Sequence, residues 1–479
     1  MKRRDFLAVA GATGLGLGWN SFLDSRFGAL WAAEKTDYTL RVGPVTIELA
    51  PGRAVRTLGY NGSSPGPLLR FRESQTITVE VINDTDNPEL VHWHGQFIPP
   101  EVDGSSEEGT PFVPARGRRR YTFTPRPAGT RWYHTHVMAG RNLHRGTYTG
   151  QFGFVYIEPK DDPGKYDREV FLALHEWEPF FTSEEEEEEA GCRLPDEPRI
   201  VAAAYRAVPP PEKENGLEVG YKRFSINDRA LGHGDPIRVR EGDRVLFHIL
   251  NASATEIRRV ALPGHQFTVV SLDGNPAPVQ ATVETLQLGP GERIDAIVEM
   301  SQPGVWIFGV THNDDRTAGM GIVVEYSGRN GNPRWVDPPK ARWDYTVFGK
   351  QQDIPQPDGR FELAFRKIPG GKGGFNRWTI NGKSFPHTEP LIVHAGRRYR
   401  LIFNNQSDDA HPVHLHRHSF ELTSVEGKKT SGIIKDTVVV RPNSRVEVDL
   451  LANDPGASLF HCHQQLHMDF GFMTLLKYA

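Results

Sequence analysis

The sequence predicts an all-β protein of three β-sandwich domains, and three observations support this fold class. Gly and Pro account for 48 and 36 of the 479 residues, which favours many turns and short strands over long helices. From about residue 38 onward, short runs rich in β-branched and aromatic residues are each bounded by Gly, Pro, Asn or Asp. A strand–Asn–loop pattern also returns roughly every 150–170 residues, the size of one β-sandwich.

The charge and the cysteine content exclude several classes of protein. Lys and Arg number 56 against 60 Asp and Glu, and this net charge of −4 argues against a general nucleic-acid binder. Two cysteines in so long a chain exclude a disulfide framework. The chain also holds 19 histidines. This large excess of imidazoles over thiols needs a chemical explanation.

Residues 1–33 are typical of an export signal rather than of a folded domain. Three basic residues at 2–4 precede an apolar, Gly-rich run from Phe6 to Trp19. The two arginines, followed by Phe6 and Leu7, resemble a twin-arginine signal, which the twin-arginine export machinery reads. A membrane anchor is the alternative, but the run is shorter than the roughly 20 apolar residues of a membrane span. We therefore expect a periplasmic or secreted bacterial protein with no membrane span in its mature chain.

An internal repeat divides the rest of the chain. Three apolar strands end in Asn before a loop, at 80–84, 248–252 and 401–405. Connectors rich in Pro, Gly and charge fall near 158–166 and 327–342. The predicted domains therefore span 38–160, 165–328 and 340–479.

An acidic insertion interrupts the strand rhythm of the second domain. Its run Glu184–Glu189 is interpreted as a solvated loop, because like charges repel and cannot be buried together. A loop that collects cations near a metal site is the alternative. Cys192 lies in the same insertion and is expected to be a free thiol.

Ten histidines lie in four short clusters, and their spacing indicates a site for several metal ions. Clustered imidazoles point to copper, zinc, iron or nickel rather than magnesium or calcium. Each cluster contains a His-x-His pair, and residues i and i+2 of a strand point to the same face. The pairs are His92/His94, His134/His136, His414/His416 and His461/His463. Eight converging imidazoles are too many for one ion.

The parity of the remaining donors indicates a second metal site. Cys462 lies between His461 and His463, so its sulfur points away from the face that the two imidazoles share. His411 has the opposite parity to the pair that follows it, and His467 follows Cys462 across a turn. Two imidazoles and one thiolate are the ligands of a trigonal blue-copper electron-transfer site. A small buried hydrophobe is the alternative role for this cysteine.

With these four motifs in this order, nearly the whole chain resembles the three-domain multicopper oxidases (laccases, bilirubin oxidases, cuprous and ferrous oxidases). The resemblance implies three cupredoxin-like Greek-key domains and four copper ions. A type 1 copper would lie in the third domain, and one type 2 and two type 3 coppers would lie between the first and third. The implied ligands are His411, Cys462 and His467 for type 1, His92 and His414 for type 2, and His94, His134, His136, His416, His461 and His463 for type 3.

Three further positions take their meaning from the same resemblance. Phe472 occupies the axial position of the type 1 site and cannot coordinate, so we expect a high-potential copper. Asp103 matches an acidic residue beside the type 2 copper that would supply protons for dioxygen reduction, with a plain Asp-Gly turn as the alternative. The segment Leu288–Asp295 matches a family sequence that is structural and binds no copper. Where some members carry a Glu before the last type 1 histidine, this chain has Leu466.

Other residues depart from the family pattern or stand apart from it. Arg417 replaces a Gly next to the third motif, where a bulky cation could alter the loop or the approach of substrate. His418 is expected to be hydrogen-bonded and not a ligand, and Met468 and Met473 to pack in the core. The eight scattered histidines are expected to be structural or on the surface: His144, His175, His233, His248, His265, His312, His387 and His394.

The leading interpretation is a laccase-like oxidase that takes single electrons from phenols or aromatic amines and reduces dioxygen to water. A metal oxidase for Cu(I) or Fe(II) is the alternative, which the acidic run favours and the absence of a Met-rich segment opposes. A non-enzymatic periplasmic scaffold is disfavoured because all eleven ligands are present, and a nitrite reductase because it lacks the eight-histidine cluster. The expected partners are a small-molecule reductant and dioxygen.

Overall fold

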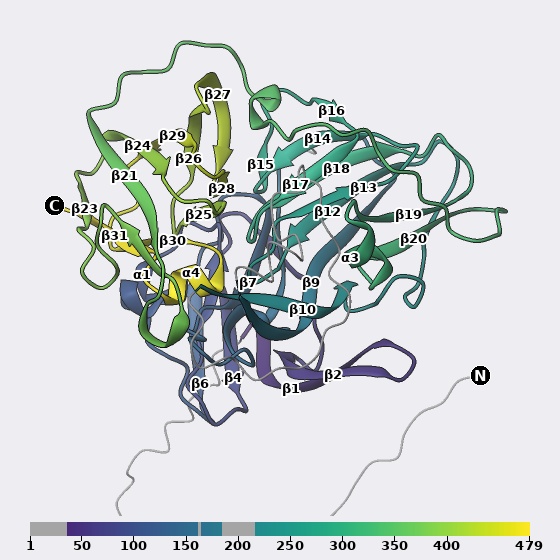
Figure 1. Cartoon of the computed structure of the whole chain (residues 1–479), viewed down its shortest axis with the longest axis horizontal. Coiled ribbons are helices and arrows are strands. Elements are labelled where there is room, and N and C mark those ends of the chain that lie inside the picture. Colours follow the sequence, from purple (N-terminus) through teal and green to yellow (C-terminus); the bar gives the residue numbers. More distant parts are fainter. Residues whose placement is uncertain (1–35, 161–163, 184–215) are drawn as a thin grey trace, which may run out of the picture. The chain divides into compact units, whose positions relative to one another are not determined.

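The computed structural model describes residues 36–160, 164–183 and 216–479, and strands dominate these ranges (Figure 1). The signal expected at 1–33, the acidic run and Cys192 lie outside the described residues. Among the described residues no helix is longer than five residues, which agrees with the Gly- and Pro-rich sequence. None of these helices has the length and hydropathy needed to cross a membrane.

Two four-stranded sheets use only strands from the first third of the chain. Their strand orders are β2-β1-β4-β6 and β3-β8-β7-β5. The strands are β1 (Tyr38–Ala50), β2 (Arg53–Tyr60), β3 (Leu69–Arg72), β4 (Ile77–Asn83), β5 (Val91–His94), β6 (Arg118–Phe123), β7 (Gly129–Thr135) and β8 (Phe152–Glu158).

The middle of the chain forms a seven-stranded and a five-stranded sheet. The first has the order β10-β9-β12-β18-β14-β15 with β16 paired to β14, and the second has the order β11-β20-β19-β13-β17. The strands are β9 (Arg168–Ser183), β10 (Leu217–Ile226), β11 (Ile237–Val239), β12 (Arg244–Asn251), β13 (Arg258–Ala261), β14 (Phe267–Leu272), β15 (Asn275–Pro276), β16 (Thr282–Val283), β17 (Thr285–Leu288), β18 (Arg293–Glu299), β19 (Val305–Val310) and β20 (Gly321–Tyr326).

The last part forms sheets of six and five strands. Their orders are β22-β21-β24-β29-β26-β27 and β23-β31-β30-β25-β28. The strands are β21 (Gly359–Ile368), β22 (Arg377–Ile380), β23 (Leu391–Val393), β24 (Arg398–Asn405), β25 (His411–Leu415), β26 (Phe420–Val425), β27 (Lys428–Lys435), β28 (Thr437–Val440), β29 (Arg445–Leu451), β30 (Ser458–Cys462) and β31 (Met473–Tyr478).

Short helices lie in the loops between these strands. The α-helices are α1 (Pro100–Asp103), α3 (Asn313–Thr317) and α4 (Gln465–Asp469), and the 3₁₀ helices are η1 (Ser106–Glu108), η2 (Gly146–Tyr148), η3 (Tyr345–Phe348) and η4 (Lys372–Gly374). Two of them carry residues of the candidate site, because α1 ends at Asp103 and α4 contains His467.

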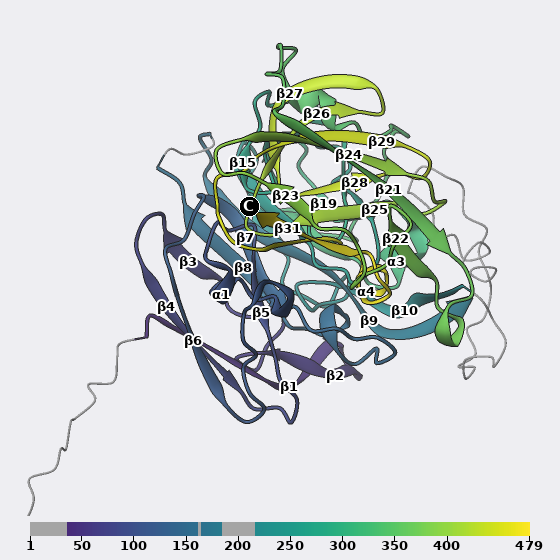
Figure 2. The same ribbon diagram turned by 90° about the vertical axis from the view of Figure 1, so that its left-hand side faces the viewer.

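One topology recurs in the three pairs of sheets. The first long strand of each pair lies parallel to a later one, β1 to β4, β9 to β12 and β21 to β24. The orders β10-β9-β12-β18-β14 and β22-β21-β24-β29-β26 correspond strand for strand. In Figures 1 and 2, β24, β29 and β26 lie side by side. The all-β, three-sandwich fold predicted from the repeat is therefore confirmed.

The repeated Asn at the strand ends has a structural cause. The side-chain amides of Asn83, Asn251 and Asn405 each donate to a backbone carbonyl four or five residues later, at 2.7–2.8 Å. Their side-chain oxygens each accept the backbone N–H two residues later, at 2.9–3.1 Å. Asn is suited to this position because its short side chain can satisfy backbone donors and acceptors locally. The sequence repeat therefore marks one sharp corner in each pair of sheets.

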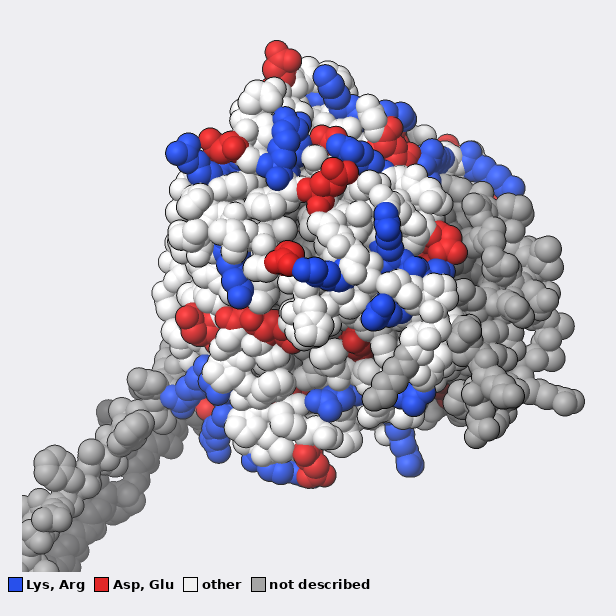
Figure 3. Space-filling view, turned by 60° about the vertical axis from the view of Figure 1, so that its left-hand side comes forward, with Lys and Arg blue, Asp and Glu red and all other residues white. Residues whose placement is uncertain are grey.

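Charged side chains are dispersed over the face drawn in Figure 3. Lys and Arg alternate there with Asp, Glu and uncharged surface, and neither sign gathers into one broad patch. This distribution agrees with the small net charge of −4.

Candidate metal centre

The four His-x-His pairs lie on neighbouring strands. In the first part of the chain β5 pairs with β7 so that His92 lies opposite His134. In the last part β25 pairs with β30 so that His414 lies opposite His461. All ten clustered histidines are at most 6% exposed. Two strand pairs, more than 270 residues apart in sequence, thus supply one buried set of imidazoles.

The eight imidazoles of these pairs converge, as their alternation predicts. Within each of three groups, one nitrogen per histidine lies within 4.8 Å of the others. The groups are His92/His94/His414, His94/His134/His463 and His136/His416/His461. Rings from the two strand pairs also stack on each other, His92 on His416 at 3.8 Å and His94 on His414 at 3.7 Å between centroids. The set is large enough for several metal ions and too large for one.

The hydrogen bonds of these rings leave free nitrogens that fit metal ions. Six of the eight rings have a buried nitrogen without a hydrogen-bond partner: His92, His94, His134, His136, His414 and His463. In His92 and His414, for example, Nδ1 donates to the carbonyl oxygens of Asp103 and Asp436, and Nε2 is left free. Orphaned buried nitrogens are costly, and a bound metal would satisfy them.

The two remaining rings face each other nitrogen to nitrogen. His461 Nδ1 donates to the carbonyl of Cys462 at 2.8 Å, so its Nε2 carries a lone pair. His416 Nδ1 contacts Asp103 Oδ2 at 2.8 Å, so its Nε2 also carries a lone pair. These two Nε2 atoms lie 3.1 Å apart. Because two lone pairs cannot hydrogen-bond each other, the pair is arranged for a shared cation.

A second donor set lies at the end of β30 and on α4. Cys462 Sγ is 3.7 Å from His411 Nδ1 and 3.5 Å from His467 Nδ1, and the two nitrogens are 3.2 Å apart. Burial lowers the pKa of His411 to about 3 and raises the pKa of the Cys462 thiol far above its ordinary value. The imidazole is thus in the neutral form that binds metals, and the thiol needs a cation to ionise. The set fits a copper ion.

An apolar ring lies beside this second set. The Phe472 ring is fully buried and lies 4.8 Å from the His411 ring, and its carbonyl accepts the Cys462 N–H at 3.1 Å. Met468 and Met473 instead pack together in a hydrophobic cluster with Leu459, as expected of core residues.

Asp103 contacts two rings of the cluster, one from the first part of the chain and one from the last. Its carboxylate Oδ2 lies 2.8 Å from His416 Nδ1 and 3.1 Å from His92 Nδ1. Burial alone would raise the pKa of this carboxyl, but His92 and His416 hold it below its ordinary value. The residue is therefore more than the turn that an Asp-Gly sequence also permits.

Sequence reasoning missed two carboxylates beside the rings. Glu108, on η1, lies 3.2 Å from His416 Nδ1 and accepts the Leu459 N–H. Burial, and next the charge of Asp103, raise the pKa of Glu108 above its ordinary value. Asp436 accepts from His94 Nε2 at 3.0 Å. No local pattern marks Asp436, whereas the closeness of Glu108 to Asp103 in sequence is a weak signal.

Arg417 has a structural role that explains its burial. Its guanidinium donates to the carbonyls of Ile98, Ala457 and Pro455 at 2.7–2.9 Å, and it pairs with Asp454 at 3.2 Å. The backbone φ of this residue is 60°, the region that favours Gly. The side chain therefore joins the loop after β5 to the loop before β30.

The buried histidines outside the donor sets have protein partners. His418 contacts the Tyr478 hydroxyl through Nε2 at 2.8 Å, as expected of a non-ligand. His175 donates from Nδ1 to the carbonyl of Ala252 at 2.9 Å. These contacts give both residues structural roles.

The fold and the two donor sets define a copper-dependent oxidoreductase, because a His₂Cys set suits electron transfer and a multi-imidazole cluster suits oxygen chemistry. Three segments, 41–162, 196–328 and 366–479, match sequence profiles described as multicopper oxidase. The chain belongs to the multicopper oxidase family. It is therefore an enzyme with four copper ions, one type 1, one type 2 and two type 3, that uses a small-molecule substrate and dioxygen.

The similarity to individual relatives covers almost the whole chain. The multicopper oxidase MmcO of Mycobacterium tuberculosis is 29% identical over 92% of this chain and 86% of its own. Copper resistance protein A of Pseudomonas syringae pv. tomato is 24% identical over 99% and 98%. The crystal structure of a multi-copper oxidase from Pseudomonas thermotolerans is 24% identical, with a TM-score of 0.66 over 93% and 100% of the two chains. The last likeness shows the shared fold.

Proposed function

We propose that this multicopper oxidase is laccase-like and takes single electrons from phenols or aromatic amines. The observation that carries this proposal is the aromatic layer over the His₂Cys set. The Trp378 ring lies 4.0 Å from the His467 ring. The backbone N–H of Trp378 donates to the carbonyl of Phe470, whose ring stacks on Phe375 at 4.3 Å. His467 and Trp378 are at most 1% exposed and Phe470 is half-buried, so Phe470 is the ring of this layer that a donor can contact. An apolar layer of aromatic rings favours an aromatic donor.

A metal oxidase acting on Cu(I) or Fe(II) is the alternative. One relative is named copper resistance protein A, and the run Glu184–Glu189 offers carboxylates to a cation. We expect kcat/KM for a substituted phenol to exceed that for Fe(II) and Cu(I) in the full chain, measured by oxygen uptake. Replacing the six glutamates by Gln should leave the phenol value unchanged. A preference for a metal ion that this replacement removes would favour the alternative.

The proposed ligands follow the two donor sets. The type 1 copper is held by His411, Cys462 and His467, the type 2 copper by His92 and His414, and the type 3 coppers by His94, His134, His136, His416, His461 and His463. The donor groups support one type 3 copper at His94/His134/His463 and the other at His136/His416/His461. The supporting domains are proposed to span 38–160, 165–328 and 340–479.

The fold positions the metal-binding nitrogens before copper binds, and the chain connects the two donor sets covalently. Bound copper supplies reversible one-electron chemistry and a place where dioxygen is reduced. Backbone carbonyls fix the tautomer of His92, His134, His414 and His461, so the correct nitrogen is free before any metal binds. Cys462 belongs to the second set, and its peptide bonds lead directly to His461 and His463 in the first. This covalent path is the shortest connection between the two sets.

Asp103 is proposed to serve proton delivery during dioxygen reduction. In Asp103→Asn we expect normal reduction of the blue copper by donor but reoxidation by oxygen slowed by about 100-fold or more, since a positioned acid–base group contributes that much. Stopped-flow absorption would measure both half-reactions. Asp228→Asn, which changes a buried carboxyl outside both donor sets, is the matched control. Reoxidation at the normal rate in Asp103→Asn would remove this role.

Phe472 is proposed to keep the type 1 potential high. Phe472→Met adds a thioether that can coordinate and stabilise Cu(II), so the potential should fall. Phe403→Met changes a buried ring of the same core without approaching the donors and should leave the potential unchanged. A redox titration of the blue absorption measures both. A wild-type potential no higher than that of Met-ligated multicopper oxidases would contradict the proposal.

Residues 1–33 are proposed to be a twin-arginine signal that exports the folded chain to the periplasm or outside the cell. Changing Arg3 and Arg4 together to Lys should leave the full-length protein in the cytoplasm of a bacterial host. Fractionation of the cells would show this. Continued export of the double variant would contradict the assignment.

A further inference from the structure

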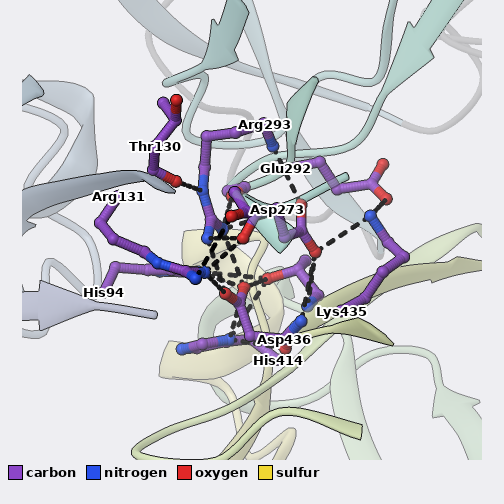
Figure 4. A network of polar contacts seen from close by, with 12 residues as sticks. His94, Thr130, Arg131, Asp273, Glu292, Arg293, His414, Lys435 and Asp436 are labelled. Atoms are coloured by element: carbon purple, nitrogen blue, oxygen red, sulfur yellow. Dashed lines mark hydrogen bonds and ion pairs between the residues drawn. The ribbon is translucent and has the colours of Figure 1, made fainter. Parts of the chain in front are cut away.

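A fully buried network of charges contacts His94 and His414 of the candidate cluster (Figure 4). At its centre, Asp436 receives two parallel hydrogen bonds from Arg293, Nη1 to Oδ1 at 2.8 Å and Nη2 to Oδ2 at 2.6 Å. The same Oδ1 accepts from His94 Nε2 at 3.0 Å, and the Asp436 carbonyl accepts from His414 Nδ1 at 2.8 Å. One aspartate thus contacts two imidazoles of the cluster and one guanidinium.

The network joins three distant parts of the chain. His94 lies on β5, Arg293 begins β18, and Asp436 lies between β27 and β28. Arg293 is anchored on its own side, because it also donates to the carbonyls of Gly291 at 2.9 Å and Asp273 at 3.1 Å. In the middle part, the residues that the structure describes (164–183 and 216–328) supply no donor to the groups of metal-ligating residues, yet they supply this arginine.

Asp273 strengthens the same connection. Its carboxylate accepts the backbone N–H of Asp436 at 3.2 Å and of Thr437 at 3.1 Å, and it pairs with Lys435 Nζ at 2.9 Å. The backbone on either side of Asp436 is therefore clamped from the middle part of the chain. Arg131 approaches Asp436 Oδ2 only to 3.6 Å, so Arg293 is the principal partner of this carboxylate.

The close approach of backbone to the rings is a second, independent observation. A Cβ atom at Gly291 would lie 2.8 Å from Cδ2 of His463, and one at Gly95 would lie 2.6 Å from Oδ2 of Asp436. Both glycines have positive φ, at 86° and 81°. The segment that contains Arg293 is thus packed against the rings as closely as backbone can be.

We propose that Arg293 is a positioning residue for the trinuclear centre, which it serves by holding Asp436 in place against His94. With Nε2–H of His94 engaged by Asp436, the ring presents its free Nδ1 to the neighbouring donors of His134 and His463. A bidentate guanidinium fixes both oxygens of the carboxylate, which a point charge cannot do. Partners of this kind, one step removed from the metal, set ligand orientation and affinity. The proposal rests on the ligand assignment of the proposed function.

Arg293→Met tests the proposal, with Arg293→Lys as the conservative variant. We expect Arg293→Met to bind the two type 3 coppers about 10–100-fold more weakly and to retain the blue type 1 copper. Arg293→Lys should recover only part of the affinity. Copper per chain, measured by titration with a copper chelator, and the absorption of the coupled copper pair and of the blue copper give the readouts.

Arg258→Met is the matched control, because Arg258 is an equally buried arginine held by Glu176 at 2.6 Å and Asp315 at 2.6 Å away from both donor sets. It should lower the unfolding temperature and keep every copper. Wild-type copper affinity in Arg293→Met, or equal losses in Arg258→Met, would overturn the positioning role. A wild-type chain with fewer than four coppers would instead overturn the ligand assignment beneath it.

Discussion

Cys462→Ser is expected to lose the blue absorption and all oxidation of donor above the level of copper-free protein. The thiolate is the one sulfur in the His₂Cys set, and a hydroxyl does not ionise to replace it. The eight imidazoles of the other set are untouched, so the variant should keep three of its four coppers. Copper analysis, the visible spectrum and oxygen uptake with a phenol would measure these effects.

The second cysteine provides the control for this variant. Cys192→Ser should keep the blue absorption and turnover, because Cys192 lies outside the four histidine clusters. A blue Cys462→Ser protein, or loss of the blue band in Cys192→Ser, would show that the type 1 thiolate has been assigned to the wrong residue.

His414→Gln is expected to stop turnover by blocking the reoxidation of the enzyme by oxygen, whereas Cys462→Ser blocks its reduction by donor. The blue copper should still be reduced by donor, but its colour should not return in the presence of oxygen. The reason is that His414 Nε2 is one of only two nitrogens assigned to the type 2 copper, and one imidazole alone holds that ion weakly. Anaerobic reduction followed by exposure to oxygen, monitored in the visible spectrum, separates the two half-reactions.

His175→Gln controls for the loss of a buried histidine. His175 is 1% exposed and hydrogen-bonded to a backbone carbonyl, but it belongs to neither donor set. We expect it to lose stability and keep both half-reactions. Rapid reoxidation in His414→Gln would contradict the type 2 assignment.

The positions of most donors could be predicted because they follow from local geometry. The alternation of a strand places both imidazoles of a His-x-His pair on one face, and this needs no knowledge of the fold. The same parity separates Cys462 from His461 and His463 on either side. The repeated Asn similarly revealed the three sandwiches, because a side chain that turns the backbone at a strand end acts within a few residues.

The rest of the site could not be predicted because its contacts join residues far apart in sequence. Arg293 and Asp436 are separated by 143 residues, and His94 and Asp436 by 342. The segment Leu288–Asp295 was expected to be structural and to bind no copper, but its sequence did not show that Arg293 bonds to Asp436 or that Gly291 packs against His463. Nor could the six type 3 candidates be divided into two groups without the distances between them.

Arg417 shows the limit of a single-residue comparison. Its charge next to the third motif suggested an effect on the loop or on substrate approach. The structure gives every nitrogen of the guanidinium a carbonyl or carboxylate partner. The residues next to a long side chain in sequence therefore do not show which groups its head contacts, because the head group lies several ångströms from its own backbone.

The stoichiometry of oxygen uptake tests the central claim most directly. Reduction of dioxygen to two waters takes four electrons, so a chain with both donor sets filled by copper should oxidise four molecules of a one-electron phenolic donor for each dioxygen consumed, with no peroxide released. An oxygen electrode and a spectrophotometer, read together during one turnover series, measure this ratio. Two donors per dioxygen with accumulation of hydrogen peroxide would contradict the account.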